Sequence, residues 1–145
     1  MAASLLDTAF EAELRALIFL FLLDEPVNAD YLGALDTLAI NQRTFGIGSA
    51  NLNGTHRLAA GELRARTDLM SQALKQLTLK GLATFDVSAE PVGFRITDAG
   101  ASVVNNLRTE YAEQFFAATL DTLEAAGHAS TTYLTKIITS VEATS

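Results

Sequence analysis

The side chains that most often carry out enzyme chemistry are few in this sequence and follow no catalytic pattern. Its 145 residues contain two histidines, His56 and His128, and no cysteine. A zinc site would need both histidines together with carboxylates, and their spacing is not that of a metal-binding motif. No nucleophile-elbow motif frames a serine. We therefore expect a protein that is not an enzyme and that holds no metal or cofactor.

The carboxylates and the glycines offer no better catalytic candidate. Asp24 and Glu25 precede Pro26, where they end a helix and do not form an acid–base pair. Residues 46–54, GIGSANLNG, lack the Lys-Ser/Thr ending of a phosphate-binding loop. They lie within residues 41–58, whose three glycines and three asparagines predict a long loop. Such loops are often functional. We expect this loop to contact a partner; the alternatives are a plain flexible surface and a short element that the pattern misassigns.

The composition is typical of one folded domain, residues 1–145. Apolar residues make up 49% of the chain and charged residues 19%, which separates it from disordered sequences. The most apolar stretch, residues 16–23, is shorter than the roughly 20 residues of a membrane span. Acidic residues precede it, where a signal peptide would be basic. We expect no membrane contact, and the absence of cysteine fits a cytoplasmic location.

Hydrophobic periodicity predicts two helices near the N-terminus. Apolar residues at helical spacing run from Leu14 to Leu22, and further apolar residues between them indicate a helix buried on most sides. Asp24-Glu25-Pro26 ends this helix. Asn28 is placed to cap a second helix that continues to Leu38.

Residues 60–81 predict a helix-turn-helix. Glu62–Arg66 forms a short first helix, and Thr67 or Asp68 caps the second. Gly81 ends the second helix in a left-handed conformation. The buried stripe of this helix consists of Leu69, Met70, Ala73, Leu74 and Leu77.

A β-hairpin follows, with strands at 82–87 and 93–97. Thr97 and Asp98 then cap another helix. The fold class predicted from this order is mainly α (α+β), a winged helix-turn-helix with a two-stranded wing, whose core covers about residues 59–105.

Long helical flanks surround this core at residues 8–40 and 98–142. One continuous helix, with a bend at Asn105-Asn106, is expected to run up to Gly127, and a terminal helix follows at 130–141. The apolar face of the continuous helix consists of Val103, Leu107, Tyr111, Phe115 and Ala118. We expect the flanks to pack across a two-fold axis in a homodimer. Packing within the chain onto the first helix is the alternative.

Charge is unevenly distributed along a chain whose net charge is −7. Residues 1–36 carry seven acids and one base, residues 37–97 seven bases and four acids, and residues 98–145 six acids and two bases. Proteins that bind duplex DNA commonly make about six to ten phosphate contacts, which this chain reaches only as a dimer. DNA binding is therefore a secondary expectation. Its candidate residues are Arg64, Arg66, Ser71, Gln72, Lys75, Gln76 and Arg95.

Several stretches resemble the middle components of bacterial ABC-three-component systems. The resemblance spans roughly residues 10 to 123. The stretches that carry it are FEAELRALIFLFLL, DYLGALDTL, NGTHRLAAGEL, LMSQALKQLTLKGLATF, GFRITDAG and LRTEYAEQFFAATLDTL. The sequence also resembles MarR-like and PadR-like winged-helix regulators, but more weakly.

The resemblance implies a non-enzymatic winged-helix adaptor. In Lamassu-type anti-phage defence, such a subunit is the small partner of an SMC-like ATPase and links it to an effector, commonly a nuclease. We expect partner contacts at Phe45, His56, Arg57, Tyr111, Phe115 and Phe116, and at Phe19 and Phe21 if they are exposed. The alternative is a homodimeric MarR-like transcriptional regulator whose Ser71, Gln72, Lys75, Gln76 and Arg95 read an operator.

Overall fold

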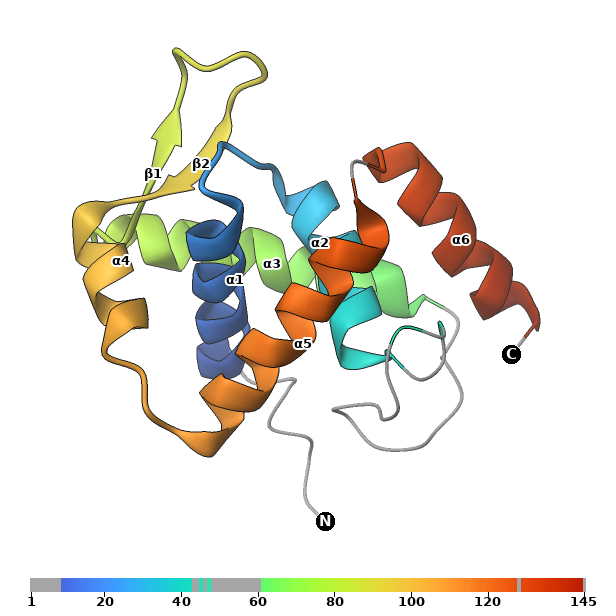
Figure 1. Cartoon of the computed structure of the whole chain (residues 1–145). Helices are drawn as coiled ribbons and strands as arrows, with labels where there is room; N and C mark the ends of the chain where they lie inside the picture. The colour runs from blue at the N-terminus through green and yellow to red at the C-terminus, as the bar shows by residue number, and fades with distance from the viewer. Residues whose placement is uncertain (1–8, 43–44, 46, 48–60, 128, 145) are drawn as a thin grey trace.

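Figure 1 shows the computed structural model of the chain, a group of helices from which one β-hairpin projects. The structure describes residues 9–42, 45, 47, 61–127 and 129–144. Its elements in chain order are α1 (Ala9–Leu23), α2 (Ala29–Ile40), α3 (Glu62–Leu79), β1 (Ala83–Asp86), β2 (Gly93–Ile96), α4 (Asp98–Asn105), α5 (Glu110–Ala126) and α6 (Thr131–Thr144). The predicted fold class, mainly α with a two-stranded wing, is confirmed. Within the described residues, no helix is both long enough and apolar enough to cross a bilayer.

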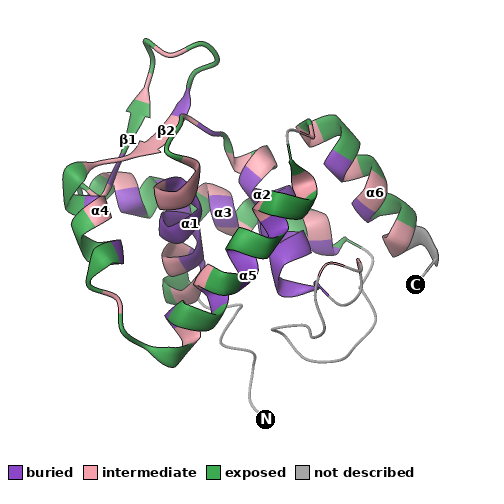
Figure 2. Ribbon diagram, viewed as in Figure 1, coloured by how far each residue is buried: buried purple, intermediate pink, exposed green. Residues whose placement is uncertain are grey.

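Helix α1 lies in the interior of the molecule, as its apolar sequence predicts. Six consecutive residues, Arg15 to Leu20, are buried, so the helix is enclosed on all its faces over this stretch. Helices α3 and α5 pack against it, and Figure 2 shows its central turns among the buried parts of the molecule. The helix ends at Leu23, before Asp24-Glu25-Pro26, as expected.

Asn28 caps α2, which confirms the prediction: its side-chain oxygen accepts a hydrogen bond from the backbone N–H of Tyr31 at 2.8 Å. Just before this cap, Val27 forms an isolated β-bridge with Phe94 of the hairpin through two backbone hydrogen bonds of 2.9 and 2.7 Å. A Cβ atom at Gly93 would lie only 2.6 Å from the backbone nitrogen of Val27. This glycine therefore permits the hairpin to approach the segment between α1 and α2.

The turn predicted at Thr67 and Asp68 is wrong, because Glu62–Leu79 forms one continuous helix, α3. The segment contains no glycine or proline to interrupt it. Thr67 packs against α2, where a Cβ atom on Gly33 would lie 2.1 Å from the Thr67 hydroxyl oxygen. Thr67 therefore lies where α2 and α3 cross, and it does not cap a helix. The helix that pairs most extensively with α3 is α2, which precedes it in the chain.

The hairpin and its two flanking helix ends follow the prediction. Gly81, with φ of 79°, ends α3, and Thr97 caps α4 by accepting a hydrogen bond from Gly100 N–H at 3.1 Å. Strands β1 and β2 are antiparallel, with Phe85 opposite Phe94. The hairpin thus connects α3 with α4, and its second strand also pairs with Val27 ahead of α2.

The continuous helix predicted through Asn105 is wrong. Helix α4 ends at Asn105, and α5 begins only at Glu110, after Thr109 accepts the N–H of Ala112 at 3.1 Å as its N-cap. Arg108 stabilises the connection by donating to the carbonyl oxygen of Asn105 at 2.8 Å. The change of direction carries α5 back across α1 and α2 (Figure 1).

Helix α5 packs inside the chain, which corresponds to the alternative considered for the flanks. The rings of Phe19 and Phe115 meet edge to face with their centroids 5.5 Å apart. Gly127 ends α5 as predicted. The predicted terminal helix is α6, whose Leu134 and Ile138 are buried and which packs on α2. Homodimerisation stays a prediction.

Candidate functional site

A network of a buried ion pair and one further hydrogen bond joins α1, α2 and α5. The Nε of Arg15 donates to Asp36 Oδ1 at 2.8 Å and its Nη2 to Oδ2 at 3.1 Å, and both side chains are completely buried. The remaining Nη1 donates to the hydroxyl oxygen of Tyr111 at 3.3 Å. Sequence reasoning missed this network. The signal was a single arginine inside an apolar helix and a single aspartate among the apolar residues of the next one, since each needs a buried partner.

The electrostatics of this network make it structural and not catalytic. Burial lowers the pKa of Arg15, but the charge and hydrogen bonds of Asp36 outweigh this and raise the pKa above its ordinary value. Burial raises the pKa of Tyr111 above 10.0, and Arg15 opposes that shift only in part. Neither group changes its charge near neutral pH, as a general acid or base would have to do.

The exposed face of α3 holds part of the predicted DNA-contact set. Gln72, Lys75 and Gln76 are exposed and line, with the first turns of α1, a cleft of about 500 Å³. Ser71 beside them is half-buried. Arg64 is exposed but lies eleven residues before Lys75, about 16 Å along the helix axis.

Arg66 does not join these residues. Its side chain is buried, and its Nε lies 3.8 Å from a carboxylate oxygen of Glu62 one turn earlier in α3. The prediction of Arg66 as a DNA contact therefore disagrees with its placement in the fold, because a buried guanidinium cannot reach a phosphate without rearrangement.

Two of the cations that could face DNA are paired with acids. Arg95 of β2 lies 3.6 Å from Asp86 of β1, and Lys80 at the end of α3 lies 2.5 Å from Glu13 of α1. Hydrogen bonds from Ser88, with a smaller effect of Arg95, lower the pKa of Asp86 below its ordinary value. The carboxylate of Asp86 is therefore ionised at neutral pH, and the wing carries no excess of positive charge.

The wing instead exposes apolar side chains. Four of the eight exposed large apolar residues among the described residues lie at the end of α3 or in the hairpin: Leu79, Phe85, Val87 and Val92. Val87 is 74% exposed. We define these four residues as the wing surface. Three of the four lie on the projecting hairpin, and apolar groups gathered in this way are typical of protein contacts.

The aromatic residues predicted to bind a partner divide between the core and the surface. Phe115 is completely buried against Phe19 and is not available to a partner in this fold. Phe19 was expected to contact a partner only if exposed, and it is buried as well. Tyr111 is half-buried and bonded to Arg15. Phe116 is half-buried beside Phe21. The two rings line an apolar groove of about 420 Å³.

The predicted contacts in the long loop are only partly visible. Phe45 is half-buried and packs against the core. His56 and Arg57 lie outside the described residues.

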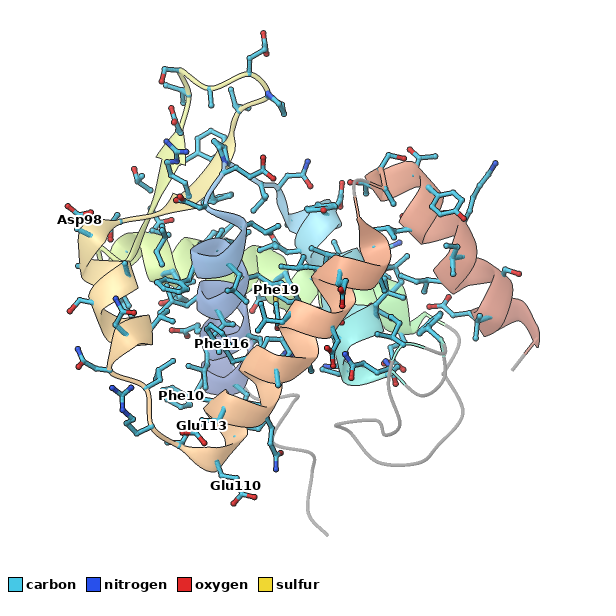
Figure 3. All side chains as sticks on the ribbon, viewed as in Figure 1. Phe10, Phe19, Asp98, Glu110, Glu113 and Phe116 are labelled. Carbon is cyan, nitrogen blue, oxygen red and sulfur yellow. The ribbon has the colours of Figure 1, made fainter. Side chains whose placement is uncertain are left out.

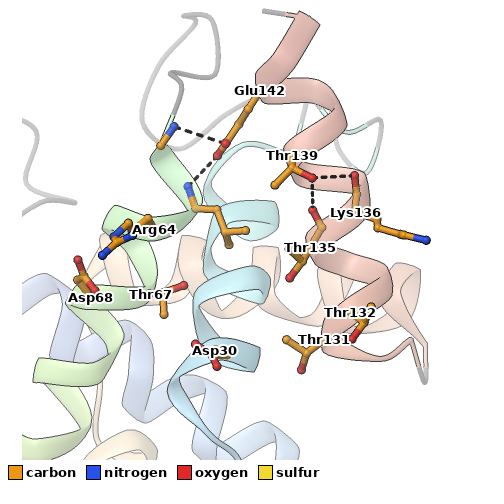
Figure 4. Close-up of a pocket in the computed structure, with 12 residues that line it drawn as sticks. Asp30, Arg64, Thr67, Asp68, Thr131, Thr132, Thr135, Lys136, Thr139 and Glu142 are labelled. Atoms are coloured by element: carbon orange, nitrogen blue, oxygen red, sulfur yellow. Dashed lines mark hydrogen bonds between the residues drawn. The ribbon is translucent and has the colours of Figure 1, made fainter.

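A third cleft, of about 670 Å³, separates α3 from α6 and is lined by five threonines and several charged residues (Figure 4). Glu142 of α6 accepts the backbone N–H groups of Leu63 at 2.9 Å and Gly61 at 3.4 Å. This carboxylate occupies the positive end of α3, where a bound anion would otherwise be favoured. In the part of the chain that the structure describes, no three His, Cys, Asp or Glu residues are grouped so that they could hold a metal ion.

Comparison with known proteins gives one match. The family model described as ABC-three component (ABC-3C) system Middle Component 2 matches residues 5–145. No curated protein and no solved structure matches the chain.

Proposed function

Because this chain belongs to the ABC-three component system Middle Component 2 family, we propose that it is a non-enzymatic adaptor. In this proposal it links an SMC-like ATPase to an effector, such as a nuclease, in a bacterial anti-phage defence complex of the Lamassu type. The match includes α6, beyond the stretch in which the sequence alone shows a resemblance.

The character of the wing surface is the observation that carries this proposal. A hairpin that binds DNA contributes cations that replace the counterions of phosphates. Here the hairpin's arginine, Arg95, is paired with Asp86, while Phe85, Val87 and Val92 face solvent. Contact of these side chains with another protein would remove their apolar surface from water. Contact of these side chains with a polyanion would not remove that surface from water.

The arrangement of surfaces also suits an adaptor. The hairpin projects from one end of the molecule, and the α4–α5 connection lies at the opposite end (Figure 1). Two partners can therefore contact the chain at once without competing for one surface.

A transcriptional regulator is the second candidate, because Gln72, Lys75 and Gln76 are exposed together on the helix that precedes the hairpin. Glutamine can read adenine, and lysine can read guanine or phosphate. In this alternative the chain binds one operator sequence tightly as a homodimer.

Co-purification with the SMC-like ATPase encoded beside this chain tests the adaptor proposal. The substitution Val87→Asp adds a charge to the wing surface at an exposed position, and we expect it to lower recovery of the complex at least tenfold. The matched variant, Lys75→Ala with Arg95→Ala, should leave recovery within twofold. Both variants are first checked for an unchanged midpoint of urea denaturation.

A duplex DNA titration across a series of salt concentrations separates the two candidates. The adaptor proposal predicts weak binding with no sequence preference at physiological salt. Tight binding to one sequence that the Lys75→Ala, Arg95→Ala variant loses would establish the regulator and overturn the adaptor.

A further inference from the structure

An apolar groove lies between the end of α1, the end of α4 and the first half of α5. Its floor is formed by Val104, which is buried, and by Phe21, Leu107 and Phe116, which are half-buried. Leu120 of α5 stands at its edge and is 49% exposed. The groove exists because α4 ends at Asn105 and α5 begins in a new direction at Glu110, where the sequence predicts only a bend in one helix.

The groove follows the axis of α5 for about two turns. Glu113, Phe116 and Leu120 are spaced by three and four residues, so they share one face of the helix. An occupant that runs along this face meets apolar side chains in the middle and a carboxylate at the end. Apolar side chains at this helical spacing can pack against the apolar stripe of a second helix.

The surroundings of the groove are acidic. Helix α5 contains four acids, Glu110, Glu113, Asp121 and Glu124, and no lysine or arginine. Glu110 and Glu113 lie together at the end of the molecule that is opposite the hairpin (Figure 3). Glu113, Asp121 and Glu124 are exposed, and the structure records no ion pair for any of the three within the described residues. Their charges are available to a partner.

Arg108 also lines the groove, and its single charge offsets only part of the charge of the four acids of α5. Arg108 directs its guanidinium at the carbonyl oxygens of Asn105 and Leu107, at 2.8 and 2.7 Å. It is therefore held against the last turn of α4. Residues 98–127 contain five acids and this single base.

We propose that this groove binds a basic amphipathic helix of a protein partner. The apolar residues of that helix enter the groove between Phe116 and Leu120, and its lysines or arginines face Glu113 and Glu124. A second copy of this chain is a poor occupant, because pairing two α5 helices would bring eight acids together. The inference rests on the proposed adaptor function and names the chemistry of one of its partners.

The test uses a labelled synthetic helix as the probe, with leucines at i, i+3, i+4 and i+7 and lysines at the other exposed positions. A matched probe carries glutamates in place of the lysines. We expect the lysine probe to bind the full chain and the glutamate probe to bind at least tenfold more weakly. Equal binding of the two probes would overturn the proposal.

Matched variants of the protein locate the binding. Leu120→Lys should weaken binding of the lysine probe at least tenfold, while Leu79→Lys, the same change at a more exposed position on the wing surface, should leave it within twofold. Glu113→Gln with Glu124→Gln should weaken binding several-fold at low salt, and Glu90→Gln in the hairpin should not. If Leu120→Lys and Leu79→Lys bind equally well, the probe does not use the groove, and the proposal fails.

Co-purification with the SMC-like ATPase and the effector separates this proposal from the adaptor function. Leu120→Lys should lower the recovery of one of the two partners at least tenfold and leave the recovery of the other within twofold. A complex that loses neither partner with this variant, yet is broken by Val87→Asp, overturns the groove proposal and leaves the adaptor standing. Absence of any complex with the unsubstituted chain overturns the adaptor. Self-association that Leu120→Lys abolishes would make a second copy the occupant and overturn the proposal.

Discussion

Two arginine–aspartate pairs among the described residues lie in opposite environments. Arg15 and Asp36 form two hydrogen bonds in the core, where neither side chain meets solvent. Arg95 and Asp86 face each other across the hairpin at 3.6 Å, and the arginine is 42% exposed. Water competes with the second pair and not with the first. Burial therefore decides whether the same chemistry holds helices together or only neutralises a surface.

The regions around the two pairs differ in the same way. In the core, each charge has one geometry, because losing its partner would leave a desolvated ion. On the hairpin, the pair can open at little cost, so its consequence is the removal of net positive charge from the wing. The core pair therefore ties α1 to α2, and the hairpin pair leaves the wing without excess positive charge.

The largest effect is expected for Arg15→Leu. This change leaves the carboxylate of Asp36 buried without its partner, and we expect the free energy of unfolding to fall by about 3–5 kcal/mol. Urea denaturation measures the change. The double variant Arg15→Leu, Asp36→Leu is the control and should recover most of the loss, since no charge is then buried alone. A double variant as unstable as the single one would show that the charge is not the cause.

A smaller loss is expected for Gly33→Ala, which tests how tightly the same core is packed. The new Cβ atom would lie 2.1 Å from Thr67 Oγ1 and 2.7 Å from its Cα. We expect a loss of about 1–3 kcal/mol in denaturation, because α2 and α3 must move apart. Thr67→Ala removes the hydroxyl but not the Cα, so Gly33→Ala should still destabilise that background. If Thr67→Ala restored the full stability of the Gly33→Ala variant, the clash with the Thr67 backbone would not be what limits the approach of α2 and α3.

Tyr111→Phe removes only the hydroxyl that accepts from Arg15, and we expect a loss of about 1 kcal/mol at neutral pH. The pKa of Tyr111 is raised in the folded protein, chiefly by burial. The contribution of its neutral phenol is therefore present below pH 10 and is lost as the pH rises through the folded value. Denaturation between pH 7 and pH 11 should show the two proteins converging. A constant difference over this range would contradict the assignment.

The smallest effect is expected for Asp86→Asn in the hairpin. The pKa of Asp86 is lowered, first by hydrogen bonds from Ser88. Any stability it contributes is therefore present above its ordinary pKa of 3.8 and is lost as the pH falls through the folded value. Denaturation of the variant and the unsubstituted chain should differ slightly at pH 7 and not at pH 2. A loss as large as that of Arg15→Leu would remove the contrast between the two pairs.

Local signals predicted most helix ends correctly. Asn28 and Thr97 cap helices because their side-chain oxygens accept N–H groups of the next turn, and Gly81 and Gly127 end helices because they adopt positive φ. These effects involve residues within one turn of each other. The mainly helical fold and its hairpin follow from such signals together with hydrophobic periodicity, and they could be predicted from the sequence.

The candidate surfaces could be predicted only in part. Gln72, Lys75 and Gln76 were expected to be exposed and are, because their position on the helix face opposite the apolar stripe sets their exposure. Helical spacing puts Phe115 on the apolar face of its helix, but only the direction of α5 decides that this ring packs against Phe19.

The sequence by itself determined the kinds of elements, most of their ends and the acidic character of both flanks. Only the tertiary structure decided that Thr67 lies within one helix, that the chain turns between Asn105 and Glu110, and that Arg15 meets Asp36. The physical reason is the range of the interactions. Caps and periodicity act within a few residues, whereas a helix crossing, a groove and a buried ion pair depend on residues that are distant in the chain and meet only when it is folded.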